Sequence, residues 1–426
     1  MDLRKFKYIL LFLPIILFSA CEAEIDEFQA DAGELDLTTF VTIGNSLTAG
    51  FADNALYRSG QINSMGNILA GQLMHTGLSE FNQPLMKDEL GLGGRLVLSV
   101  VGGSLLPVPM PGEPDPANFE NIFESEGPFH NMGVPGAQAE HLLAPGYATM
   151  NPYFGRFASS PATSVFDDAI AMEPTFFSLW TGSNNILSYA LGGGEGLGIT
   201  PTANFQQAIM FMLSQLTANG AKGVIGNIPG VTVIPFFNTI PYNAIVIEDQ
   251  IIVDILNNAY SEAPHVVFEL GPNPLVVVDE DHPAGFRQLE EGERVLITAM
   301  SGIIEENWGT QVFLPAEYYL SLEQMDVIEN AVDSYNNIID SAADQFNLAL
   351  VDANTLLKKT QSGIFFDALE FNTEFVTGGA FSLDAVHLSA RGNAIVANAF
   401  IEAINGKYNA NIPKALVSDY PGIIFP

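Results

Sequence analysis

Disulfide bonds within the chain are excluded at once, because its 426 residues include a single cysteine, Cys21. A fold without disulfides must be held by its hydrophobic core alone. The composition is suited to that: 48% of the residues are hydrophobic and 15% are charged, which is typical of a globular protein.

Basic residues are also scarce. The chain has 15 Lys and Arg residues against 49 Asp and Glu residues, which gives a formal net charge of −34. Nucleic acids are bound by basic patches that displace counterions from phosphates, so this balance argues against a nucleic-acid partner. The acidic residues are spread along the sequence without long runs, and they indicate a solvated surface.

The sequence has little that could cross a membrane: its one marked apolar run, Tyr8–Phe18, is too short to span a bilayer. The run follows three basic residues and precedes Ser19-Ala20-Cys21, which resembles a bacterial lipoprotein signal. We therefore expect removal of residues 1–20, a lipid on Cys21, and an exported chain anchored to a bacterial membrane, at the periplasmic or surface face of the outer membrane. A plain secretory signal or an uncleaved anchor is the alternative. The acidic residues 21–37 are predicted to form a tether.

The rest of the chain alternates short apolar runs with amphipathic stretches. The predicted strands are 39–43, 175–180, 223–227 and 349–353, and the predicted helices are 62–74, 202–217, 322–346 and 389–405, the last capped by Ser389 and stopped by Gly406. This alternation predicts an α/β fold with a mainly parallel sheet covered by helices on both faces.

Two stretches interrupt the alternation. Residues 76–128 are rich in Gly and Pro, and residues 235–318 contain short apolar runs separated by Gly, Pro and acidic residues. The runs at 266–270, 275–278 and 295–298 predict small antiparallel β structure. We interpret both stretches as insertions in one domain of residues 38–410, followed by a tail of residues 411–426.

Four blocks of small and polar residues carry the chemistry. In chain order they are Gly44-Asn45-Ser46-Leu47-Thr48-Ala49-Gly50, Asn131-Met132-Gly133-Val134-Pro135-Gly136-Ala137, Thr181-Gly182-Ser183-Asn184-Asn185, and Asp384-Ala385-Val386-His387-Leu388-Ser389. Together they resemble the SGNH (GDSL-type) hydrolase family of esterases and lipases, over roughly 38–230 and 320–406. The resemblance implies a flavodoxin-like, three-layer α/β fold.

The resemblance also implies a role for each residue. Ser46 would be the nucleophile, His387 its base, and Asp384 the partner of His387. The oxyanion hole would consist of the backbone N–H groups of Ser46 and Gly136 and the side-chain amide of Asn184. No metal or other cofactor is expected.

These residue types suit those roles. A serine hydroxyl needs a base to remove its proton, and an imidazole can accept that proton and return it to the leaving group. Asp384 precedes His387 by three residues and can reach it within one turn. The family usually has Asp where Asn45 and Asn185 stand, but neither position is a catalytic one.

Structural alternatives exist for each assignment. Ser46 could be an ordinary turn serine. Asp384 and His387 could cap the last helix, and Asn184 could cap the helix that follows it.

Two further residues compete with members of the site. Gly133 competes with Gly136 for the second block, and alignment on Asn131 favours Gly136. Ser104 follows a second apolar run and two glycines, but prolines at 107, 109 and 111 stand where a helix should begin.

The sequence therefore predicts a serine ester hydrolase that works through an acyl-enzyme. A lipid or medium-chain ester is the expected substrate, with Phe236, Phe237 and residues 245–247 as candidate apolar contacts. An acylated glycan, deacetylated by the same machinery, is the alternative substrate. A non-catalytic binding lipoprotein is the alternative of a different class.

Overall fold

Five parallel strands form the central sheet of the protein. The structure is a computed structural model that describes residues 28–426. The strands are β1 (Phe40–Gly44), β4 (Asn131–Gly133), β5 (Phe176–Trp180), β6 (Lys222–Gly226) and β13 (Ala349–Val351). They lie in the order β4-β1-β5-β6-β13, and every neighbouring pair is parallel. Counted along the chain this is 2-1-3-4-5, the flavodoxin-like order, so the predicted fold class is confirmed.

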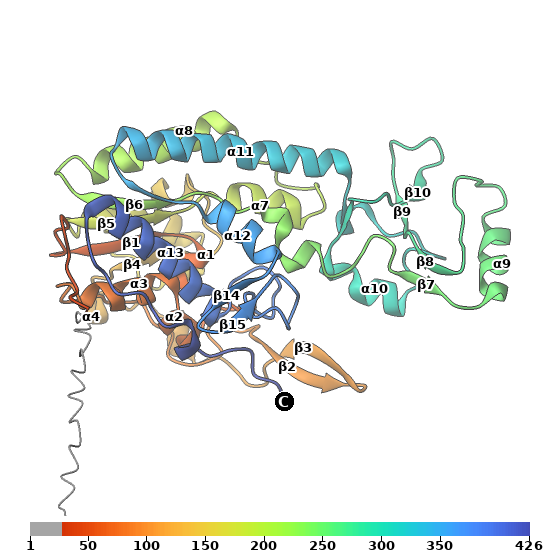
Figure 1. Cartoon of the computed structure of the whole chain (residues 1–426), viewed down its shortest axis with the longest axis horizontal. Helices are drawn as coiled ribbons and strands as arrows, with labels where there is room; N and C mark the ends of the chain where they lie inside the picture. Colours follow the sequence, from red (N-terminus) through yellow and green to blue (C-terminus); the bar gives the residue numbers. More distant parts are fainter. Residues whose placement is uncertain (1–27) are drawn as a thin grey trace, which may run out of the picture.

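Helices cover both faces of this sheet (Figure 1). On one face α3 (Met65–Met74) packs against α13 (Ala390–Tyr408). On the other face α8 (Thr202–Leu216) packs against α11 (Leu322–Gln345). Strands β1 and β5 are buried along their whole length, as expected for parallel strands covered on both sides.

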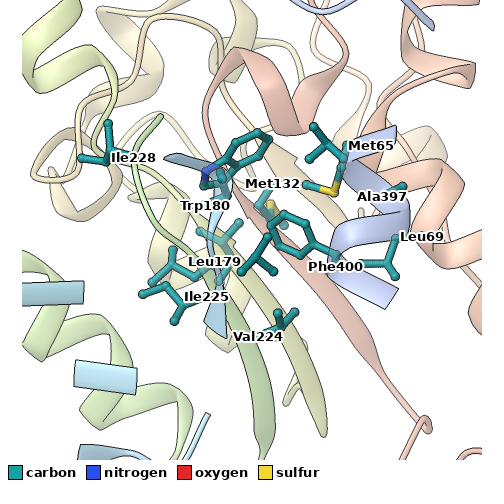
Figure 2. Packing of buried hydrophobic residues seen from close by; sticks show 14 of the residues in the cluster. Met65, Leu69, Met132, Leu179, Trp180, Val224, Ile225, Ile228, Ala397 and Phe400 are labelled. Atoms are coloured by element: carbon teal, nitrogen blue, oxygen red, sulfur yellow. The ribbon is translucent and has the colours of Figure 1, made fainter. Parts of the chain in front are cut away.

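The main core fills the space between the sheet and the helices (Figure 2). Phe400 of α13 lies against Trp180 at the end of β5, with ring centroids 5.6 Å apart. Gly226 of β6 allows this contact, because a Cβ atom there would lie 2.6 Å from Trp180 Cδ1. The core therefore reaches the carboxyl edge of the sheet.

Shorter elements connect these layers. They are α1 (Ser46–Ala49), α2 (Arg58–Ile62), α4 (Phe123–Glu126), α5 (Pro152–Gly155), α6 (Val165–Ile170), α7 (Asn184–Leu191), α12 (Ala353–Gln361), β14 (Ile364–Phe366) and β15 (Leu369–Phe371). Strands β14 and β15 form an antiparallel hairpin.

The first predicted insertion, 76–128, carries a hairpin that projects from the body (Figure 1). Its strands are β2 (Leu96–Val101) and β3 (Ser104–Pro109), joined by Gly102 and Gly103 with positive φ angles.

The second predicted insertion, 235–318, forms most of a lobe at one end of the molecule (Figure 1). Its elements are β7 (Ile245–Ile247), α9 (Gln250–Ala259), β8 (Gly271–Asn273), β9 (Val276–Val278), β10 (Phe286–Gln288), β11 (Arg294–Val295) and α10 (Met300–Glu305), and β11 pairs with β12 (Tyr319–Leu320) just beyond it. Its paired strands are all antiparallel, and an isolated parallel bridge joins Val277 to Leu314. Two clusters of buried residues, separate from the main core, hold the lobe together.

Two sequence predictions about local structure are wrong in detail. The helix expected over 62–74 is two helices, because Ser64 accepts the N–H of Asn67 and so caps a new helix, α3. Residues 266–270 are not a strand, because the Phe268 backbone is bonded to the side chain of Asn257.

Helix α13 does not end at Gly406. It continues to Tyr408 and ends at Asn409, which has the left-handed backbone (φ 51°) that terminates many helices. The cap predicted at Ser389 is confirmed, since its hydroxyl accepts the Gly392 N–H.

The N-terminal predictions fall largely outside the described residues. These are the signal over residues 1–20, the lipid on Cys21 and the first part of the tether. From Asp31 onward the chain is packed: Asp31 pairs with Asn411, and Glu34 forms an ion pair with Lys222 at 3.0 Å. Between residues 28 and 426, no helix has both the length and the apolar character needed to cross a bilayer.

Candidate active site

Three of the four sequence blocks follow neighbouring strands of the sheet. Ser46, Gly136 and Asn184 follow shortly after the ends of β1, β4 and β5, and β1 lies between the other two strands. Because the carboxyl ends of parallel strands meet at one edge, the three blocks converge there. The strand order reverses at β1, and this is the position where open α/β sheets place their ligands.

The fourth block brings a histidine to the serine. His387 Nε2 lies 3.0 Å from Ser46 Oγ, and His387 Nδ1 lies 2.9 Å from Asp384 Oδ2. The carboxylate of Asp384 accepts a hydrogen bond from the Nδ1–H group, so Nε2 carries a lone pair that can accept the serine proton. Ser46, His387 and Asp384 therefore form one continuous hydrogen-bonded chain. Ser46 and His387 are 341 positions apart in the sequence.

The carboxylate of Asp384 is held by four further donors. It accepts the backbone N–H groups of Asn54, Val386 and His387 and the hydroxyl of Ser382, at distances of 2.8–3.0 Å. Burial acts to raise its pKa, but the contact with His387 and the N–H donors outweigh this and hold the pKa of Asp384 well below its ordinary value. Asp384 is therefore ionised at neutral pH.

Two features orient the imidazole and its turn. Ala385 has a left-handed backbone (φ 64°), which turns the chain back so that Asp384 faces His387. The His387 ring also packs against Phe51, with centroids 4.7 Å apart.

Close backbone contacts position Ser46. A Cβ atom on Gly44 would lie 2.2 Å from Thr48 Oγ1, and one on Gly133 would lie 2.4 Å from the backbone nitrogen of Ala49. Glycine at both positions allows α1 to lie directly across the ends of β1 and β4. Asn45 caps α1, because its Oδ1 accepts the N–H of Leu47 at 3.0 Å. An uncharged amide is sufficient for this cap.

Gly136 and Asn184 lie at the same edge of the sheet. Gly136 is exposed, with a φ of 78° that favours glycine, whereas the N–H of Gly133 is already bonded to Asn131. One amide hydrogen of Asn184 is bonded to the carbonyl of Ala137 at 2.9 Å. A side-chain amide has two hydrogens, so the second is available to a ligand.

The structure does not support the capping roles considered for Asn184, Asp384 and His387, nor Ser104 as a rival to Ser46. Helix α7 begins at Asn184 itself, with Ser183 in the cap position, so Asn184 is not a cap. The last helix is capped by Ser389 and not by Asp384 or His387. Ser104 begins the exposed strand β3 at the tip of the projecting hairpin.

Two supporting residues were missed by the sequence reading. The N–H of Asn54 bonds to Asp384, and the side chain of Asp53 bonds to the backbone of Leu383. An Asp-Asn pair is a turn signal, since both residues tolerate positive φ angles. Nothing in the sequence indicates that this turn contacts a segment 330 positions away.

Comparisons with known proteins give matches among solved structures alone. No family model matches the chain, and neither does any curated protein. A lipase/acylhydrolase from Enterococcus faecalis is 10% identical, with 89% of this chain and 100% of that chain covered at a TM-score of 0.36. A candidate GDSL-like lipase from Parabacteroides merdae is 12% identical, with 88% and 99% covered at 0.37. An acetylxylan esterase from Geobacillus stearothermophilus is 11% identical, with 88% and 98% covered at 0.38.

Similarity at this level does not identify a substrate. The strand order of the sheet establishes the fold, which is the flavodoxin-like α/β fold that the sequence resemblance to SGNH (GDSL-type) hydrolases implies. Within that fold, Ser46 is hydrogen-bonded to His387, and His387 to Asp384.

Proposed function

We propose that the protein is a serine ester hydrolase that works through an acyl-enzyme. The observation that carries the proposal is the chain of hydrogen bonds from Ser46 Oγ through His387 to Asp384. A buried, ionised carboxylate behind an imidazole, with a serine hydroxyl at its other nitrogen, is the arrangement that activates a serine as a nucleophile.

The reaction runs in two halves. Ser46 Oγ attacks the ester carbonyl while His387 Nε2 takes its proton, and Asp384 stabilises the imidazolium. Collapse of the tetrahedral intermediate breaks the ester C–O bond, and His387 gives the proton to the leaving alcohol. Water then attacks the acyl-Ser46 in the same way and releases the carboxylic acid.

The oxyanion requires donors aimed at its developing charge. In the described part of the chain, the N–H groups of Ser46 and Gly136 have no hydrogen-bond partner, and Asn184 retains one amide hydrogen. These three groups follow adjacent strands, and we assign them to the oxyanion hole.

An apolar cavity beside the site favours an acyl chain as part of the substrate. It has a volume of about 80 Å³ and lies at the same sheet edge, and its walls include Leu47, Trp180, Leu356, Val386, Leu388 and Ile395. Leu47 adjoins Ser46, while Val386 and Leu388 flank His387, so an acyl group on Ser46 has apolar surface close by. Of the apolar contacts predicted from the sequence, Phe236 is buried, and its N–H donates to the carbonyl of Ala385, between Asp384 and His387, at 3.0 Å. Phe237 is fully buried in the main core, and residues 245–247 form β7 in the lobe.

The test is labelling of the wild-type protein with a fluorophosphonate, which reacts with activated serines. We expect one label, on Ser46, and none in Ser46→Ala. Unlabelled protein from the same preparation is then compared on 4-nitrophenyl esters of increasing chain length and on acetylated xylan. A preference for butyrate to octanoate supports the acyl-ester assignment, whereas a preference for acetylated xylan identifies a glycan deacetylase. A folded wild-type protein that is not labelled would identify a binding lipoprotein instead.

We also propose that the protein is exported and anchored through a lipid on Cys21, at the outer membrane. The support for this is the basic, apolar and small-residue pattern of the first 21 residues.

A further inference from the structure

A tight turn directly behind the triad does not belong to any of the four sequence blocks. Ala52 and Ala55 exchange two backbone hydrogen bonds of 3.0 Å, with Asp53 (φ 50°) and Asn54 (φ 63°) between them. Two successive positive φ angles are typical of a type I′ turn. Residues other than glycine adopt such angles at an energetic cost, and they do so where the surroundings require it.

This turn forms hydrogen bonds with residues 382–384, a segment that ends at Asp384 of the triad. Asp53 Oδ1 accepts the Leu383 N–H at 2.9 Å, and the Asp53 N–H donates to Ser382 Oγ at 3.0 Å. Ser382 Oγ in turn donates to Asp384 Oδ1 at 3.0 Å. The Asn54 N–H donates to Asp384 Oδ2 at 2.9 Å, the same oxygen that His387 contacts. Both oxygens of Asp384 are therefore fixed, directly or through Ser382, by the 53–54 turn.

The other oxygen of Asp53 is fixed as well. Asp53 Oδ2 accepts the Tyr57 hydroxyl at 2.7 Å, and the guanidinium of Arg95 lies 3.6 Å from the centre of the Tyr57 ring. Arg95 is itself paired with Glu89 at 2.7 Å. Since both oxygens of Asp53 accept donors, the carboxylate form is the one that fits this site.

We infer that Asp53 is a positioning residue: its carboxylate holds the 382–384 segment so that Asp384 meets His387 in the reactive geometry. This inference rests on the proposed function. Asp53 does not touch the reacting atoms, and it acts on them through Leu383, Ser382 and Asp384. It also adds a second negative charge behind the Asp384–His387 pair.

The titratable and charged groups around Asp53 determine the sign of its effect. The groups that act on Asp53 directly are Tyr57, Asp384 and Arg95. Glu89 is paired with Arg95, and His387 is paired with Asp384. Burial, and to a smaller degree the charge of Asp384, raises the pKa of Asp53 above its ordinary value. A negative charge favours the charged form of a nearby imidazole, so removal of the Asp53 charge should move the acid limb of the pH profile to lower pH.

Two substitutions at Asp53 distinguish the effect of its hydrogen bond to Leu383 from the effect of its negative charge. Asp53→Asn keeps an acceptor for the Leu383 N–H but removes the charge. We expect its kcat to stay within about fivefold of wild type, while the acid limb of its pH profile moves down by roughly 0.3 pH unit or more. Asp53→Ala also removes the acceptor. We expect its kcat on a 4-nitrophenyl ester to fall by about 10- to 100-fold with little change in KM, as for residues that orient a catalytic group.

Asp168→Ala is the matched control. Asp168 is also a buried carboxylate that holds a loop, through Ser159 and Thr163, but it has no contact with the triad. The Asp168→Ala substitution should lower the stability of the protein. It should leave unchanged both kcat per active site, as counted by labelling, and the acid limb of the pH profile. Fluorophosphonate labelling counts the active sites in each variant, so a loss of folded protein is not mistaken for a loss of rate.

A second measurement does not depend on turnover. The pKa of His387 is followed by NMR in protein with ¹⁵N-labelled histidine, with the signal assigned by its loss in His387→Gln. A lower His387 pKa in Asp53→Asn than in wild type supports the inference even if the natural reaction is not ester hydrolysis. An unchanged His387 pKa in Asp53→Asn, together with wild-type kcat per site in Asp53→Ala, would overturn it. Absence of labelling in the wild type would instead count against the proposed function.

Discussion

The side-chain amide of Asn185 donates a hydrogen bond of 2.6 Å to the carboxylate of Glu140. Asn185 is fully buried, and it also donates to Thr200 and accepts the Ala139 N–H. It thereby fastens the loop after β4, which carries Gly136, to helix α7, which carries Asn184. An aspartate at position 185 would place a second carboxylate against Glu140, which explains why this chain has the amide.

We therefore predict that Asn185→Asp lowers the free energy of unfolding by about 3 kcal/mol, because a buried carboxylate would face the half-buried carboxylate of Glu140. Urea denaturation at pH 7 measures this. The double variant Asn185→Asp with Glu140→Gln restores an amide–carboxylate pair and should recover most of the loss. Additive effects of the two substitutions would show that the residues are not coupled.

Asn45→Asp should retain activity within about threefold of wild type. The carboxylate keeps the acceptor for the Leu47 N–H and is favoured at a helix N-terminus. Asn45→Ala removes the cap and should cost about 1 kcal/mol of stability, with a lower kcat because Ser46 is the first residue of α1. Equal kcat values for Asn45→Ala and wild type would show that the cap does not position the nucleophile.

Phe51→Ala should lower kcat by about 10-fold, because the His387 ring loses the surface on which it packs. The change in KM should be smaller than the change in kcat. Phe51→Tyr keeps the ring and serves as the control. Steady-state kinetics on one aryl ester compare the three proteins, and equal loss in both variants would contradict the packing role.

The pH dependence follows from the lowered pKa of Asp384. Asp384 stays ionised wherever an ordinary imidazole titrates, at about 6.5, so the acid limb of kcat/KM should follow one ionisation. A limb that follows two ionisations would show that Asp384 also takes up a proton in this range.

The same lowered pKa affects stability. The stabilisation by the ionised Asp384 is complete above the ordinary carboxyl pKa of about 4 and is lost as the pH falls through the lower folded value. Between pH 5 and pH 2, the urea midpoint of wild type should therefore fall more steeply than that of Asp384→Asn. Parallel curves for the two proteins would contradict this.

Cys21→Ser should release the protein from the membrane fraction of a bacterial host, because the proposed lipid is attached to that sulfur. Labelling with a radioactive fatty acid, followed by fractionation, compares the two proteins. Radiolabel on the Cys21→Ser protein would show that the lipid is attached elsewhere.

The sequence predicted most of the sheet, because buried parallel strands are short apolar runs that the chain repeats between amphipathic helices. Ser46 and Asn184 could be placed at one edge, since each follows a predicted strand, but β4, the short strand before Gly136, was not predicted. The pairing of the Asp53–Asn54 turn with Asp384 could not be predicted, because a turn signal does not say which distant segment it contacts. Residues 266–270 were misread as a strand because a side chain, that of Asn257, supplies the partner for the Phe268 backbone.

The 341 positions between Ser46 and His387 also affect how activity arises during folding. The nucleophile is made among the first residues of the domain, and its base is made among the last. A growing chain therefore carries an inert serine until its final helix docks, and contacts of such long range form late and slowly. Recovery of ester hydrolysis after dilution from urea should consequently lag behind recovery of helical circular dichroism, which makes catalysis a reporter of complete folding.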